Sequence, residues 1–103
     1  MVIDQGLLVK VKNYLRISHN VLDDDISDTI VACQRDLEVY GVQIPVSDDP
    51  QEMDPLILNA IKLYCKSEYL DDPVKAAAYR ERYDALKSCL GMAEDYREVV
   101  RYG

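Results

Sequence analysis

Residues 7–41 read LLVKVKNYLRISHNVLDDDISDTIVACQRDLEVYG, and this stretch contains two helical patterns separated by a polar break. In its first part, apolar side chains recur at helical spacing, which predicts a short helix that begins after Asp4 as its N-cap. Residues 17–20 interrupt the pattern and indicate a connection between two helices. The apolar positions of the first helix are Leu7, Leu8, Val11, Tyr14 and Leu15.

The second pattern is longer and predicts a helix over residues 22–40, because its apolar residues recur every three or four positions and form one stripe. We expect one of the three aspartates Asp23, Asp24 and Asp25 to cap its first turn, and the others to complement the positive end of the helix dipole. Gly41 supplies the positive φ at which helices commonly end. The stripe consists of Leu22, Ile26, Ile30, Cys33, Leu37 and Tyr40.

Two Asp-Pro pairs predict the starts of two further helices. Asp54-Pro55 and Asp72-Pro73 each place an N-cap acceptor before a proline at the first helical position, where the missing N–H has no cost. We expect Gly91 to end the second of these helices. Only Asp71-Asp72 separates the two, so they should form a tight antiparallel hairpin. The sequence therefore predicts an all-α fold, a small four-helix bundle-like domain over residues 1–91.

Residues 92–103 have a different character, with charged side chains between Tyr96, Val99, Val100 and Tyr102. The two valines favour extended structure. We expect an extended C-terminal tail that docks on a partner, and the alternative interpretation is a frayed terminus. The residues expected to make the docking contacts are Tyr96, Arg97, Val99, Val100, Arg101 and Tyr102.

Tyrosine is the chain's aromatic residue: there are eight tyrosines and neither phenylalanine nor tryptophan. Tyrosine suits half-buried positions, because its ring is apolar and its hydroxyl needs a partner. We expect Tyr64, Tyr79 and Tyr83 to line the rim of a small core.

The charge balance excludes a typical DNA-binding protein. The 103 residues carry a net charge of −7, and residues 1–52 contain four basic and ten acidic side chains. Binding to phosphates depends on clustered Lys and Arg. The helix predicted over residues 22–40 exposes Asp28, Asp36 and Glu38 beside a single arginine, which does not fit a DNA-recognition helix. No apolar run approaches the length of a membrane span, and the start does not resemble a signal peptide, so we expect a cytoplasmic protein without a membrane contact.

Motifs that carry chemistry are missing from the sequence. Cys33, Cys65 and Cys89 form no CxxC pair, and their odd number argues against a disulfide framework, so we expect three buried, reduced thiols. A single histidine, His19, excludes a multi-histidine metal site and is the sole conventional base for a nucleophile. The acidic residues cluster at helix starts, where capping explains them, and they form no calcium loop. We therefore expect no cofactor, no metal and no enzymatic activity.

Four segments resemble one family, and they occur in the family's order and spacing. They are the end of the first helix (Asn13-Tyr14-Leu15-Arg16-Ile17), the acidic entry Asp23-Asp24-Asp25, the Asp54-Pro55 start of a helix with Ala60-Ile61-Lys62-Leu63-Tyr64, and Tyr83-Asp84-Ala85-Leu86-Lys87 followed by a tail with Asp95-Tyr96-Arg97. The chain thus resembles the small head–tail connector (adaptor) proteins of long-tailed bacteriophages, and the resemblance covers most of its length.

The resemblance implies a structural assembly protein of a phage or prophage. About a dozen copies would form a ring with one heterologous interface on the portal protein, extend the DNA channel and receive the head-closure or tail-completion protein. DNA would pass through the ring without specific binding, and Asp23, Asp24 and Asp25 are candidates to face the channel. The protein would be in the host cytoplasm during assembly and in the connector of the virion afterwards.

A second function fits the composition. A small acidic helical protein could instead bind another protein, for example as an immunity-type inhibitor of a basic nuclease. Its acidic charge and tyrosine content are compatible with that role, and a ring-shaped assembly would favour the connector.

Overall fold

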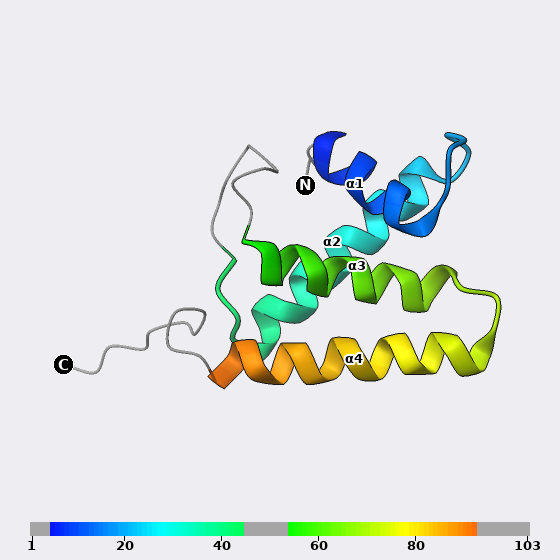
Figure 1. Ribbon diagram of the computed structural model, residues 1–103. Coiled ribbons are helices and arrows are strands. Elements are labelled where there is room, and N and C mark those ends of the chain that lie inside the picture. The colour runs from blue at the N-terminus through cyan, green and yellow to red at the C-terminus, as the bar shows by residue number, and fades with distance from the viewer. Residues whose placement is uncertain (1–4, 45–53, 93–103) are drawn as a thin grey trace.

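The computed structural model describes residues 5–44 and 54–92, and this part of the chain is built of four α-helices (Figure 1). The predicted all-α fold is confirmed. The described helices are α1 (Gln5–Leu15), α2 (Asp23–Tyr40), α3 (Pro55–Tyr69) and α4 (Pro73–Met92). Among them, no helix combines the length and the apolar character needed to cross a membrane.

The two C-terminal helices form the predicted antiparallel hairpin, and they lie side by side along their length (Figure 1). Both Asp-Pro starts act as expected. The carboxylate of Asp54 accepts a hydrogen bond from the Leu56 amide at 2.8 Å. Asp72 Oδ1 accepts from the amides of Val74 at 2.9 Å and Lys75 at 3.3 Å. Each carboxylate thereby satisfies amides that a helix start leaves without intrahelical partners.

The core lies where α1 and α2 pack on this hairpin. α1 contacts α2 and α3, and α2 contacts α3 and α4. The predicted apolar stripe of α2 faces inward at Ile26, Ile30, Cys33 and Leu37, which are fully buried. At its two ends, Leu22 is partly buried and Tyr40 is 49% exposed. The remaining buried apolar residues are Leu7, Leu8, Val11, Val42, Ile57, Ala60, Ile61, Leu63, Cys65, Tyr83 and Leu90.

The prediction for the C-terminal end of α2 is confirmed, and the prediction for its N-terminal end is wrong. At its C-terminal end Gly41 has φ 106° and its amide donates to the Glu38 carbonyl, which confirms the predicted helix end. At its N-terminal end the N-cap is Leu22, with no side-chain hydrogen bond to the first turn, so the prediction of an aspartate cap is wrong. Asp23 points to α1 instead, where its Oδ1 lies 2.7 Å from Lys12 Nζ. One of the three candidate capping residues is thus paired with a lysine of the neighbouring helix. All three aspartates still lie in the first turn, where they complement the helix dipole.

Gly91 does not end α4, because the helix continues to Met92. The prediction of a glycine stop is wrong at this position. A Cβ atom on Gly91 would lie 2.6 Å from Cε1 of Tyr40, the last residue of α2. Glycine at this position leaves room for the Tyr40 ring against α4, and it does not form a turn.

Candidate interaction surfaces

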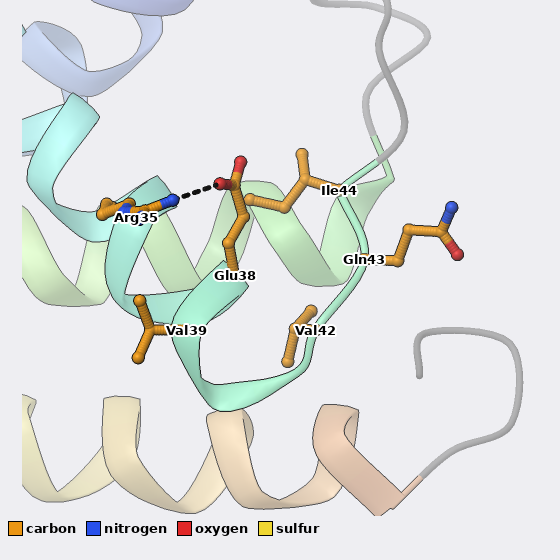
Figure 2. A pocket seen from close by; sticks show the side chains of 6 residues that line it. All are labelled: Arg35, Glu38, Val39, Val42, Gln43 and Ile44. Carbon is orange, nitrogen blue, oxygen red and sulfur yellow. Dashed lines mark ion pairs between the residues drawn. The ribbon is translucent and has the colours of Figure 1, made fainter. Parts of the chain in front are cut away.

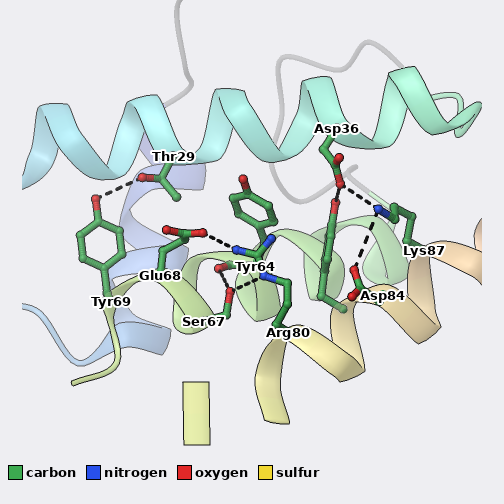
Figure 3. A network of polar contacts seen from close by, with 10 residues as sticks. Thr29, Asp36, Tyr64, Ser67, Glu68, Tyr69, Arg80, Asp84 and Lys87 are labelled. Carbon is green, nitrogen blue, oxygen red and sulfur yellow. Dashed lines mark hydrogen bonds and ion pairs between the residues drawn. The ribbon is translucent and has the colours of Figure 1, made fainter. Parts of the chain in front are cut away.

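A network of polar side chains ties α2 to the hairpin, and Asp36 is at its centre (Figure 3). The hydroxyl of Tyr83 donates to Asp36 Oδ2 at 2.5 Å, and Lys87 Nζ donates to the same oxygen at 3.2 Å. The expectation that Tyr83 lies at the rim of the core is wrong, because its side chain is completely buried. The expectation that Asp36 is simply exposed is also wrong, because it is partly covered by its two partners from α4.

These contacts determine the ionisation of both groups. Burial, and then the hydrogen bond to Asp36, raise the pKa of Tyr83, so its hydroxyl stays protonated and available as a donor. Burial alone would raise the pKa of Asp36. The hydrogen bonds from Tyr83 and Lys87 outweigh that effect, so the pKa of Asp36 is below its ordinary value.

Arg80 extends the network along α3. Its Nε donates to Ser67 Oγ at 3.1 Å, and its guanidinium pairs with the Glu68 carboxylate. The guanidinium carbon lies 4.3 Å from the centroid of the Tyr64 ring, which in turn packs edge-on against Tyr83 at 5.1 Å. The Arg80 contacts therefore hold α3 and α4 together, and the Asp36 contacts hold α2 on this hairpin.

A shallow groove of about 450 Å³ runs along the outward side of the end of α2 (Figure 2). Arg35 and Glu38 form an ion pair at 3.6 Å on one side of it. Val39 from α2 and Val42 and Ile44 from the following segment provide its apolar lining, and Gln43 completes it. Mixed apolar and charged walls of this kind suit the side chains of a protein partner.

Apolar side chains are also exposed near the C-terminal ends of α2 and α4. Val39 is 74% exposed, Met92 is 75% exposed and Tyr40 is 49% exposed. Such residues are typical of interfaces when they gather in one area. Sequence reasoning missed Val39, although one signal was present: it is a large apolar residue outside the inward stripe of α2.

The remaining predicted site residues are only partly described. Asp24 and Asp25 are exposed on α2, and Asp23 is paired with Lys12 as given above. The channel-facing role of these aspartates stays a prediction. The docking residues of the tail lie outside the described residues; they are Tyr96, Arg97, Val99, Val100, Arg101 and Tyr102.

The cysteines differ from one another in exposure. Cys33 and Cys65 are buried, as expected, and burial raises the pKa of both thiols, to about 12 for Cys65. These two thiols are therefore protonated at neutral pH. Cys89 is exposed, so the expectation of three buried thiols is wrong for it. In residues 5–44 and 54–92, His, Cys, Asp and Glu side chains do not gather into a group that could hold a metal ion.

Comparison with known families identified a family that matches this chain. The family described as "Phage connector protein" matches residues 7–97, which is most of the chain and extends five residues beyond the end of α4. Comparison with curated proteins and comparison with solved structures gave no match.

Proposed function

This chain belongs to the phage connector protein family, and we propose from that premise that it links the head of a phage or prophage particle to its tail. The observation that carries the proposal is the family match over residues 7–97, which includes all four helices except the first two residues of α1. A connector is a structural component of the virion and acts by assembly rather than by catalysis. The immunity-type alternative is supported only by the acidic charge and the tyrosine content of the chain.

In this proposal about a dozen copies form a ring on the portal protein through one heterologous contact, which generates a ring when its rotation closes. The ring extends the DNA channel and receives the head-closure or tail-completion protein. DNA passes through it during packaging and exit without specific binding, in keeping with the net charge of −7. Assembly takes place in the host cytoplasm, and the assembled ring becomes the virion connector.

The helical domain of residues 1–91 and the tail of residues 92–103 have different tasks in this proposal. The tail docks on the portal protein or on the neighbouring subunit. Two observations support this role. The tail begins at Met92, whose apolar side chain is exposed at the end of α4, and the family match continues past α4 to residue 97.

The test is deletion of residues 93–103, compared with the full chain. Negative-stain microscopy would score rings on portal particles from the same phage, and circular dichroism would check that the truncated chain is folded. We expect a folded truncated monomer that does not join the particle. Normal assembly of the truncated chain would rule out docking by the tail, and failure of the full chain to join the portal would rule out the connector function.

A further inference from the structure

Five side chains from three helices form a basic–aromatic patch, defined as Tyr14 of α1, Lys62 and Lys66 of α3, and Tyr79 and Arg82 of α4. The ammonium groups of Lys62 and Lys66 each lie 5.7 Å from the centroid of the Tyr14 ring. Lys66 also lies 6.0 Å from the Tyr79 ring, and the Arg82 guanidinium lies 5.3 Å from it. These are cation–π distances, so the two rings hold three positive charges together at the surface.

The positive charges of this patch have no carboxylate partner among the described residues. The same hairpin contains two other cations that do: Arg80 pairs with Glu68, and Lys87 pairs with Asp36 at 3.2 Å. None of Lys62, Lys66 and Arg82 has a carboxylate of the described chain within ion-pair distance. In a chain of net charge −7, three adjacent cations that form no ion pair within residues 5–44 and 54–92 indicate a site for an acidic partner.

The patch lies on the side of the hairpin away from α2. A helix turns by about 200° over two residues, so side chains two positions apart point in nearly opposite directions. Lys62 and Lys66 each lie two positions from Tyr64, and Arg82 lies two positions from Arg80. Figure 3 shows that Tyr64 and Arg80 belong to the network beneath α2. The three cations of the patch therefore point away from that helix.

The outward face of α2 is acidic. Asp24 and Asp28 each lie two positions from Ile26, whose side chain is fully buried, so by the same rotation both aspartates point away from the core. Asp25 lies at the edge of this face, on the side of α3, where its charge helps to raise the pKa of Tyr69. All three are exposed and have no ion-pair partner among the described residues. An acidic face and a basic patch thus occupy opposite sides of one molecule.

We infer that the basic–aromatic patch binds the outward face of α2 in a second copy of this chain, so that Lys62, Lys66 and Arg82 meet Asp24, Asp25 and Asp28 of the neighbour. Complementary surfaces on opposite sides produce a heterologous contact, the kind that generates a ring. The inference rests on the proposed connector function and defines its subunit interface. It places Asp24 and Asp25 between subunits and not toward the channel.

A second copy fits the patch better than DNA does. Duplex DNA is bound by many phosphate contacts, and a patch of three cations offers few. The remaining surface of this acidic chain would repel the phosphate backbone. A neighbouring copy presents a matching number of carboxylates on a rigid helix.

The test uses two charge-reversed variants. The first carries Lys62→Glu, Lys66→Glu and Arg82→Glu, and the second carries Asp24→Lys, Asp25→Lys and Asp28→Lys. Each variant alone would place like charges against each other at every subunit contact. In an equimolar mixture, each variant meets a complementary surface on both sides. Assembly is measured by sedimentation velocity at low salt and by microscopy on portal particles.

We expect neither variant to assemble alone and the mixture to recover rings of the wild-type size. The single change Lys66→Glu should weaken association about tenfold or more. The matched control Lys75→Glu reverses an exposed lysine of α4 that lies outside the patch, and it should have no effect. Because lysines in the first turn of α2 oppose the helix dipole, the pair Lys66→Glu and Asp28→Lys provides a milder mixture if the triple variant does not fold.

Three outcomes would overturn the inference. The first is a mixture that fails to assemble under conditions in which the wild-type chain assembles. The second is the formation of normal rings by either variant alone. Either result would show that the two surfaces do not meet. Loss of affinity for a labelled DNA duplex in the first variant, with unchanged assembly, would assign the patch to DNA. None of these outcomes contradicts the proposed connector function. That function is contradicted only if the wild-type chain itself does not join the portal.

Discussion

The last two turns of α2 face two different environments. On the inward side, Leu37 is fully buried, and Asp36 receives hydrogen bonds from Tyr83 and Lys87. On the outward side, Val39 is 74% exposed, and Arg35 and Glu38 pair with each other at 3.6 Å beside an open groove. Neighbouring residues of the sequence therefore differ in role: some stabilise the subunit, and others are exposed and available for a partner.

The difference shows how a chain of this size combines folding with assembly. The inward polar groups are satisfied within the subunit, so changing them should alter the free energy of unfolding. The outward groups contribute little to the stability of the subunit and remain available for a partner. Substitutions on the two sides should accordingly separate folding from assembly.

The largest expected effect comes from Leu37→Ala. This change removes a fully buried side chain and leaves a cavity, so the free energy of unfolding should fall by about 2–5 kcal/mol. Urea denaturation followed by circular dichroism measures it. The control Val39→Ala, on the outward side, should change stability by no more than about 0.5 kcal/mol. Equal losses for the two variants would contradict the distinction between the sides.

Tyr83→Phe should have the next largest effect. It removes the hydroxyl that donates to Asp36 and keeps the buried ring, so we expect a loss of about 1–2 kcal/mol in the free energy of unfolding. Tyr79→Phe is the matched control, because Tyr79 is only partly buried and its hydroxyl has no hydrogen bond in the described residues. A Tyr83 variant as stable as the wild type would mean that solvent replaces the hydroxyl at no cost.

The free energy of unfolding should depend on pH through the ionisation of Asp36. Because its pKa is lower in the folded chain than the ordinary value of 3.8, ionised Asp36 stabilises the fold above pH 3.8. That contribution is lost as the pH falls through the lower, folded-state pKa. Urea titrations from neutral pH to pH 3 should show a flatter profile for Asp36→Asn than for the wild type. Parallel profiles would indicate that other carboxylates cause the acid sensitivity.

The smallest effect is expected at the contact between α2 and the end of α4. In Gly91→Ala the new Cβ would lie 2.6 Å from Tyr40 Cε1, and the half-exposed ring must move. This cost should exceed the gain in helix propensity slightly, giving a net loss below about 1 kcal/mol. In a Tyr40→Ala background the same change should stabilise α4 by about 0.5–1 kcal/mol. A loss in both backgrounds would mean that Gly91 serves another purpose.

Most of the fold could be predicted from local patterns. The stripe of α2, its end at Gly41 and the two Asp-Pro starts all depend on residues within one or two helical turns. The errors arose where a second helix intervened. Asp23, one of the three aspartates expected to cap α2, pairs with Lys12 of α1. Gly91, which was expected to end α4, lies against the ring of Tyr40 of α2. The groove was not predicted, because its residues are recognised only once the neighbouring segments are in place.

The sequence by itself determined four helices, an acidic charge and the order of segments that identifies the family, because spacing, capping and composition act along the chain. Only the tertiary structure decided which charges are neutralised within the subunit. Arg80 and Lys87 meet carboxylates of α3 and α2. Lys62, Lys66 and Arg82, on the other side of the same hairpin, meet the rings of Tyr14 and Tyr79 instead. The physical reason is that ion pairs between helices depend on which faces the packing brings together, and the sequence pattern of one helix does not contain that information.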